Sequence, residues 1–233
     1  MTRLASLLFI LGLGFFLISL FVVFPFAEAP MIVGGTIAMQ APAETGAANV
    51  VTSVVLGYRG IDTLGEIAIL FSAATAAGLV LGRREVSRAV VNAPGGDVLK
   101  TGADLLFPLL LMVGAYIIVH GHLTPGGGFQ GGVILAAAFF VPVLARPSSL
   151  PRHGLIGLIE GTAGAAFIVI GLLGLWYGHA FMQPFLDKGI MGGLLSAGTL
   201  PWLYLALGLK VGAELAGLLA HLALDAPVTG DAD

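Results

Sequence analysis

Long apolar runs separated by short polar stretches dominate the chain. Six of these runs have roughly 18–23 residues, which is enough for a helix to cross a bilayer core of about 30 Å. They cover approximately residues 4–24, 62–81, 103–120, 129–145, 154–177 and 200–222. Prolines lie beside several runs, where helices would begin or end. The pattern predicts an all-α, polytopic bundle of about six transmembrane helices.

Composition supports this class. The 233 residues are 58% hydrophobic and only 10% charged, whereas ordinary soluble domains are about 25% charged. The mean hydropathy is +1.02. The absence of cysteine excludes disulfides, thiolate chemistry and cysteine-held clusters. The net charge of −3 and the lack of a basic patch argue against a nucleic-acid partner.

The first run has a second interpretation. It follows Arg3, and the small residues "AEA" at 27–29 resemble a signal-peptide cleavage site. However, the run is longer than the apolar region of a typical signal peptide. An uncleaved membrane anchor is therefore favoured, with a cleaved leader as the alternative.

Basic residues predict the orientation, because Lys and Arg collect on the cytoplasmic side of a membrane. With a cytoplasmic N-terminus, one side holds seven of the ten Lys and Arg residues. These seven are Arg3, Arg83, Arg84, Arg88, Lys100, Arg146 and Arg152. Both termini are expected in the cytoplasm, and the protein in the inner (plasma) membrane.

The one sustained polar stretch, "RREVSRAVVNAPGGDVLK" at 83–100, suggests a boundary near Ala93–Gly96. Before it, residues 1–92 carry two spans joined by a long Ala/Gly/Pro-rich loop. After it, residues 98–224 carry four spans. Residues 225–233 form an acidic tail.

The stretch "HGHLTPGGGFQGG" at 120–132 stands between two apolar runs. It contains G-x-G-x-x-G, but no strand precedes it, so a dinucleotide site is disfavoured. The simplest interpretation is a tight turn between antiparallel helices. The alternative is a re-entrant element, with His120 and His122 at the mouth of a cavity as proton relays. The turn residues concerned are Thr124, Pro125, Gly126, Gly127, Gly128, Gly131 and Gly132. Two histidines alone make a weak metal site, and no metal or cofactor is expected.

Charged residues inside the spans form two groups, and such residues usually face a bundle interior or a water path. Arg59, Asp62 and Glu66 have helical spacing at the start of the second span, where they form either a capped ion pair or part of a proton path. Lys210 and Glu214 lie one turn apart within the last span, as a buried structural pair or a proton relay.

Other polar and aromatic residues in the spans carry weaker predictions. Glu160 lies inside the fifth span, on the face of Gly157 and Gly164, and its role is open. Asp104 is expected to begin the third helix. Four aromatic residues are expected to anchor the outer membrane interface: Trp176, Tyr177, Trp202 and Tyr204.

Two segments resemble a known family. "FPLLLMVGAYIIVHGHLTPGGGFQGGVILAAAFFVPVLA" at 107–145 is similar to the B subunit of multisubunit Mrp-type Na⁺/H⁺ antiporters. The resemblance continues to about residue 222. Residues 49–74, "NVVTSVVLGYRGIDTLGEIAILFSAA", resemble the C-terminal end of the large A subunit of the antiporter. They are equally similar to the E subunit of membrane-bound hydrogenases. The resemblance implies a fusion of an E-like and a B-like module.

This resemblance implies an accessory membrane subunit of a cation/proton antiporter rather than an enzyme. Its partners would be other membrane subunits of an antiporter or complex I-like assembly, with Na⁺ and H⁺ as transported ions. Glu66 would take part in the ion path. One alternative places the same module in a redox-driven ion pump, such as a membrane-bound hydrogenase or formate hydrogenlyase relative. A second alternative is a structural scaffold that carries no ions.

Overall fold

The protein is described from a computed structural model, which places residues 2–23, 31–81, 96–146, 149 and 153–225. These residues form helices and loops, without strands. Six helices are long and apolar enough to span a membrane: Leu4–Val23, Gly60–Val80, Asp97–Val119, Gly128–Ala145, Gly154–Gly178 and Leu200–Leu222. The all-α class and the six predicted spans are therefore confirmed, with small shifts at the ends.

The chain divides into two compact units, Met1–Met39 and Gln40–Asp233. In the first, α1 (Thr2–Val23) has an uninterrupted apolar sequence and buries none of its membrane-length stretch. Such a surface suits lipid or another apolar helix. The "AEA" segment at 27–29 lies outside the described residues.

The loop predicted between the first two spans is largely helical, so that prediction was wrong. It contains α2 (Ile32–Thr45), the short α3 (Val50–Thr52) and a π-helical turn, η1 (Ser53–Tyr58). Asn49 caps α3 by accepting a 3.0 Å hydrogen bond from the backbone N–H of Val51. These elements are short, and α2 contains Gly34, Gly35 and Pro42, so the sequence gives only a weak helix signal here.

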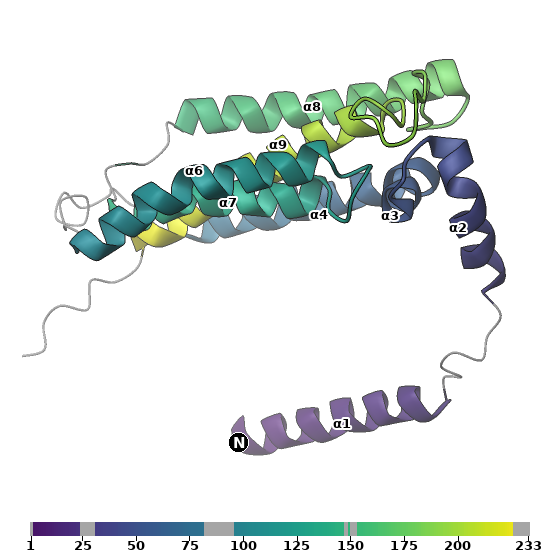
Figure 1. The fold of residues 1–233 in the computed structure, drawn as a ribbon. Helices are drawn as coiled ribbons and strands as arrows, with labels where there is room; N and C mark the ends of the chain where they lie inside the picture. Colours follow the sequence, from purple (N-terminus) through teal and green to yellow (C-terminus); the bar gives the residue numbers. More distant parts are fainter. Residues whose placement is uncertain (1, 24–30, 82–95, 147–148, 150–152, 226–233) are drawn as a thin grey trace, which may run out of the picture. The chain divides into compact units, whose positions relative to one another are not determined.

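The second unit contains a bundle of long helices (Figure 1). These helices are α4 (Gly60–Leu81), α6 (Asp97–Val119), α7 (Gly128–Ala145), α8 (His153–Gly178) and α9 (Leu200–Asp225). The most buried helix is α9, with 61% of its apolar stretch buried, against 39% for α7 and less for the others. It packs against α4, α7 and α8, whereas α6 packs mainly on α7. The last span is therefore the centre of the bundle.

Small residues allow α7 to approach α9 closely. A Cβ at Gly132 would lie 2.9 Å from the backbone oxygen of Gly208, and one at Gly128 would lie 2.7 Å from Cβ of Leu207. Gly212 faces Gly132 in turn. Gly208 and Gly212 thus form a small-residue face that packs against neighbouring helices, as such faces do in membranes.

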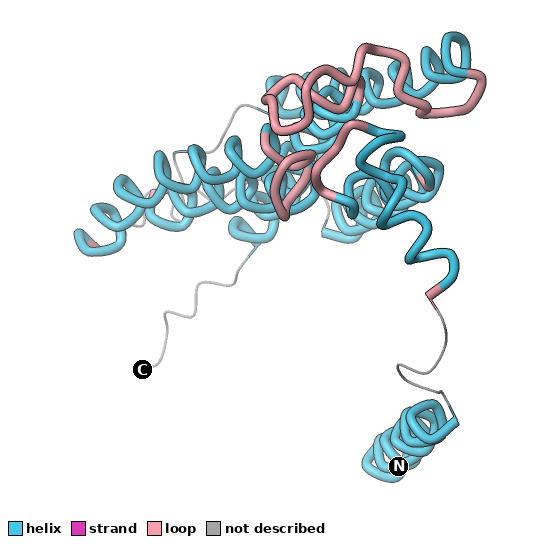
Figure 2. Tube along the Cα trace, turned by 45° about the vertical axis from the view of Figure 1, so that its right-hand side comes forward, coloured by secondary structure: helices cyan, strands magenta, loops and turns pink. Residues whose placement is uncertain are grey.

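Two irregular segments gather at one end of the bundle, and Figure 2 shows them as neighbouring pink loops. One is the turn between α6 and α7, and the other is the loop 179–199 between α8 and α9. The backbone N–H of Ala197 donates to Lys188 (2.8 Å), and that of Met182 donates to Gly171 of α8 (3.1 Å). The loop is thereby fixed to itself and to the bundle.

The predicted module boundary at Ala93–Gly96 lies almost entirely outside the described residues, as does most of the acidic tail. α6 begins at Asp97, several residues before the predicted start of the third span. Asp104 is therefore inside the helix rather than at its start, which corrects that prediction.

Candidate ion-coupling site

A cluster of three charged side chains lies between α8 and α9. The ammonium of Lys210 donates a 2.7 Å hydrogen bond to Glu160 Oε1 and a 2.9 Å hydrogen bond to Glu214 Oε2. Lys210 and Glu214 are one helical turn apart on α9, while Glu160 comes from α8, 50 residues earlier. Helical spacing sets the first pair, and the packing of α8 on α9 adds the third group.

The cluster is largely shielded from solvent. The side chains of Lys210 and Glu214 are 7% and 3% exposed, and that of Glu160 is 25% exposed. Gly164, one turn beyond Glu160, lies against the aliphatic stem of Lys210. Hydrogen bonds between ionised groups are stronger than neutral ones, and burial strengthens them further. Lys210 therefore links α8 to α9 by charge as well as by packing.

Lys210 also faces α4. Its Nζ lies 4.8 Å from the ring centroid of Phe71, within the range of a cation–π interaction. One ammonium thus contacts side chains from α4, α8 and α9. All three helices are membrane-length, so the contact lies within the predicted membrane region.

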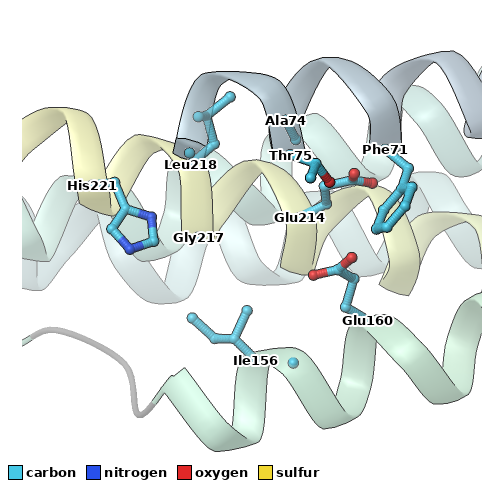
Figure 3. Close-up of a pocket in the computed structure, with 11 residues that line it drawn as sticks. Phe71, Ala74, Thr75, Ile156, Glu160, Glu214, Gly217, Leu218 and His221 are labelled. Carbon is cyan, nitrogen blue, oxygen red and sulfur yellow. The ribbon is translucent and has the colours of Figure 1, made fainter. Parts of the chain in front are cut away.

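A cavity of about 260 Å³ adjoins the carboxylates, between α4, α8 and α9 (Figure 3). Glu160 and Glu214 extend into this space from opposite sides, with the Phe71 ring beside them. Thr75 lies next to Glu214, and His221 lies two turns further along α9. The cavity is at the end of the bundle where α4 and α9 end and α8 begins, which is the predicted cytoplasmic end.

A second cavity, of about 200 Å³, is lined by apolar side chains and Lys210. Phe71 lines both cavities. It therefore borders a space with two carboxylates and a space with none. Water and ions favour the first over the second.

Helical spacing predicts the Lys210–Glu214 pair, but it assigns no partner to Glu160. Glu160 is the residue whose place only the structure reveals, because its partner is on another helix. Its position two turns inside an apolar span was the available signal.

The other predicted group, on α4, is arranged differently. Arg59 pairs with Asp62 at 2.5 Å, and both side chains are substantially exposed. Glu66 lies one turn deeper, is exposed on the bundle surface, and makes no hydrogen bond or ion pair within the described part of the chain. The three residues share one helical region, but they do not meet the Lys210 cluster. An exposed carboxylate in a span requires a covering partner or a water path.

The glycine-rich turn proves to be a tight turn that other segments cover, rather than a break in a helix. α6 ends at Val119 and α7 begins at Gly128. Asn49 Nδ2 donates to the backbone oxygens of Gly121 (2.8 Å) and Thr124 (2.9 Å). Gly127 has φ +144°, which glycine adopts readily, and a Cβ there would lie 2.8 Å from Cε1 of Tyr204.

The two histidines of the turn have different environments. His120 is half-buried and stacks on Tyr116, with ring centroids 4.1 Å apart. His122 is completely buried, with Nε2 3.4 Å from the backbone oxygen of Gly193 and Nδ1 without a partner. Burial lowers the pKa of His122 below its ordinary value, and nearby His120 lowers it further. The expectation that both stand at a cavity mouth is wrong for His122, which is enclosed and neutral near pH 7.

One further expectation needs correction. Tyr204 is not an interface anchor, because it is 3% exposed and donates a 2.8 Å hydrogen bond to Thr52. Trp176 and Tyr177, by contrast, are 80% and 64% exposed, as anchors should be. Asp104 accepts two hydrogen bonds from the guanidinium of Arg146, at 2.8 and 2.6 Å, and so joins α6 to the end of α7.

The described residues contain no group of three or more His, Cys, Asp or Glu side chains that could hold a metal ion. The Lys210 cluster consists of one ammonium and two carboxylates joined by ion pairs. The fold and the cluster define a multi-pass helical membrane protein with charged groups buried among its central helices.

Comparison with known proteins narrows this class. Residues 98–217, about half of the chain, match the family described as a domain related to the MnhB subunit of Na⁺/H⁺ antiporters. An uncharacterized protein of Methanocaldococcus jannaschii is 30% identical over 198 residues, covering 73% of this chain and 74% of that protein. The chain belongs to the MnhB family.

Two other similarities extend beyond the family domain. A probable K⁺/H⁺ antiporter protein of Rhizobium meliloti, of the combined A/B type, is 26% identical over 219 residues, covering 80% of this chain but only 21% of that protein. A chain of the membrane-bound sulfane sulfur reductase, an archaeal respiratory membrane complex, is 38% identical with a TM-score of 0.80. That match covers 95% of this chain and 97% of the other. The glycine-rich turn and the Lys210 cluster lie inside the family domain, whereas Glu66 lies outside it.

Proposed function

We propose that the chain is an accessory membrane subunit of a multisubunit Mrp-type antiporter, which exchanges a monovalent cation such as Na⁺ for protons. The observation that carries the proposal is the Glu160–Lys210–Glu214 cluster, buried in membrane-length helices within the MnhB family domain. Buried charges inside membranes are costly and usually mark ion or proton pathways.

The cluster has the chemistry of a proton relay. Lys210 shares its ammonium between two carboxylates on different helices. Protonation of either carboxylate would weaken one ion pair and strengthen the competing one, because each interaction depends on the charge of both partners. Glu66, with Asp62 and Arg59, would provide a separate ionisable point on α4. His120 is accessible enough to exchange protons at the opposite end of the bundle, whereas His122 is positioned for packing.

The two predicted modules, residues 1–92 and 98–224, would act as one unit. Contacts of Asn49 and Thr52 with the glycine-rich turn support this arrangement, since they join the segment before α4 to the MnhB domain. The match to the Rhizobium meliloti relative over 80% of the chain also supports it, because that match extends beyond the domain.

Exposed faces of the bundle support an assembly with other membrane subunits. Membrane-length stretches of α4, α6 and α8 are only 11–17% buried. Lipid can cover their apolar parts, but the exposed Glu66 carboxylate requires polar or cationic cover. A partner helix or a shared water path would supply it.

The test is to tag the chain at its C-terminus, extract it in mild detergent and identify co-purifying proteins by mass spectrometry. Large antiporter-like membrane subunits are expected. Proton flux driven by a Na⁺ gradient would then be measured in vesicles with and without this chain. A chain that purifies stably alone, or flux that does not depend on it, would contradict the proposal.

A redox-driven pump is the second candidate host. It is favoured by the 38% identity to a chain of the sulfane sulfur reductase complex over nearly the whole length of both chains. In that host, electron transfer in other subunits would drive ion movement. Co-purification of iron–sulfur or nickel-site proteins would identify it. In either host we propose a transport role, without an active site in this chain.

A structural scaffold is the remaining alternative. It predicts that neutralising Lys210, Glu214 or Glu66 leaves ion transport unchanged whenever the complex assembles. The flux assay on assembled variants therefore separates a scaffold from a conducting subunit.

A further inference from the structure

We propose that the cavity between α4, α8 and α9 binds a single monovalent cation, H⁺ or Na⁺, at Glu214 Oε1, with Glu160 as the second carboxylate of the site. This inference rests on the proposed function and deepens it, because it assigns one cation per chain to a defined place.

The charges of the cluster do not balance. The cluster contains two carboxylates and one ammonium, so with all three groups ionised its net charge is negative by one. The other described side chains lining the cavity include one titratable group, His221 on α9, while α4 contributes Phe71 and Thr75 and no ionisable residue. An uncompensated charge is costly among buried groups. One bound cation would neutralise the cluster.

One carboxylate oxygen of the cluster has no hydrogen-bond partner. Glu214 is 5% exposed, and its Oε2 accepts from Lys210, but its Oε1 is buried and has no hydrogen-bond partner. Buried polar atoms are nearly always satisfied, and an orphaned carboxylate oxygen therefore points to a missing ligand. Glu214 lines the cavity, so a ligand there would lie beside this carboxylate.

The size and lining of the cavity suit a small cation. A cavity volume of about 260 Å³ is large enough for a cation with several waters, because a cavity needs only roughly 10–15 Å³ to hold one water. Hard cations take oxygen ligands. The cavity offers the carboxylates of Glu160 and Glu214 and the hydroxyl of Thr75, which lies next to Glu214 in Figure 3.

The test is infrared difference spectroscopy of the purified intact complex. Spectra would be recorded while pH is changed, and separately while Na⁺ is replaced by choline at constant pH. If H⁺ is the occupant, a protonated-carboxyl band appears. If Na⁺ is the occupant, a carboxylate band shifts when Na⁺ is added.

Charge balance gives specific expectations for three variants. Glu214→Gln and Glu160→Gln each leave one carboxylate opposite Lys210, so either variant should lose the cation signal completely. Lys210→Met leaves two carboxylates without an ammonium, so its signal should increase about twofold over the unmodified chain. Asp97→Asn is the matched control, because its side chain is 100% exposed at the start of α6.

A signal that is absent from the unmodified complex, or retained in both Gln variants, would overturn the site. If Glu214→Gln fails to assemble, Glu160→Gln decides, since Glu160 is partly exposed and its loss leaves the Lys210–Glu214 pair intact. If these results overturn the cation site but flux still depends on this chain, the proposed function stands. Absence of antiporter subunits from the purified complex would instead refute the proposed function.

Discussion

The phenol of Tyr204 donates a 2.8 Å hydrogen bond to the hydroxyl of Thr52, although 152 residues separate them in the chain. Thr52 in turn donates to the backbone oxygen of Gly121 at 2.7 Å. This short chain of hydrogen bonds connects α9, α3 and the glycine-rich turn. The turn is therefore held from two sides, by the central helix and by the segment that precedes α4.

Removing either hydroxyl of this hydrogen-bond chain should lower the stability of the protein, but by different amounts. Tyr204→Phe leaves Thr52 bonded to Gly121, so the loss should be about 1 kcal/mol. Thr52→Val leaves the buried Tyr204 hydroxyl unpaired, so its cost should be larger, about 1–3 kcal/mol. Thermal unfolding of the purified complex would measure both. Tyr177→Phe, at an exposed tyrosine, is the control, and equal effects of all three variants would contradict the role of the bond.

Gly127→Val should disturb assembly of the complex. The valine would adopt φ +144° at a cost of about 1–3 kcal/mol, and its Cβ would collide with the Tyr204 ring. Yield of the assembled complex after gel filtration is the measurement. Gly161→Val is the control, because nothing lies within 4 Å of a Cβ at that position. Normal assembly and transport of Gly127→Val would show that the turn tolerates a side chain.

Glu66→Gln should lower cation-coupled proton flux roughly tenfold or more while the complex still assembles, as expected when a proton-transfer group is lost. Assembly should survive because Glu66 makes no ion pair within the described part of the chain. Flux in vesicles, normalised to the amount of assembled complex, is the measurement, with Asp97→Asn as the control. Unchanged flux would remove Glu66 from the ion path.

Acidification should destabilise the protein partly through His122. Burial lowers its pKa in the folded state, so the unfolded chain binds a proton first as pH falls. The contribution of His122 to stability is fully present above about pH 6.5, the ordinary pKa of histidine. It is lost progressively as the pH falls from there to the lowered pKa of the folded state. His122→Gln should therefore flatten the fall of the melting temperature between about pH 7.5 and about pH 5.5. His120→Gln removes only the smaller, electrostatic contribution to the lowered pKa of His122, so it should flatten the fall less than His122→Gln does, and an equal change in both would contradict the assignment.

Local patterns predicted only part of the candidate site. The Lys210–Glu214 pair follows from helical spacing, because residues four apart share a helix face. The partnership with Glu160 does not follow from any spacing, since it depends on which face of α8 meets α9. The same reason explains why the prediction of an interface anchor at Tyr204 is wrong. The aromatic side chain and its position suit the membrane edge, but neighbouring segments bury it.

The sequence by itself determined the membrane class and the six spans. Bilayer thickness sets the length of an apolar helix, and backbone hydrogen bonds must be satisfied inside the span, so composition and run length are sufficient. Tertiary structure decided which helix is central, that α2 and α3 form, and that His122 is enclosed while Glu66 is exposed. These depend on side-chain contacts between distant segments, which apolar periodicity does not encode when almost every face of a helix is apolar.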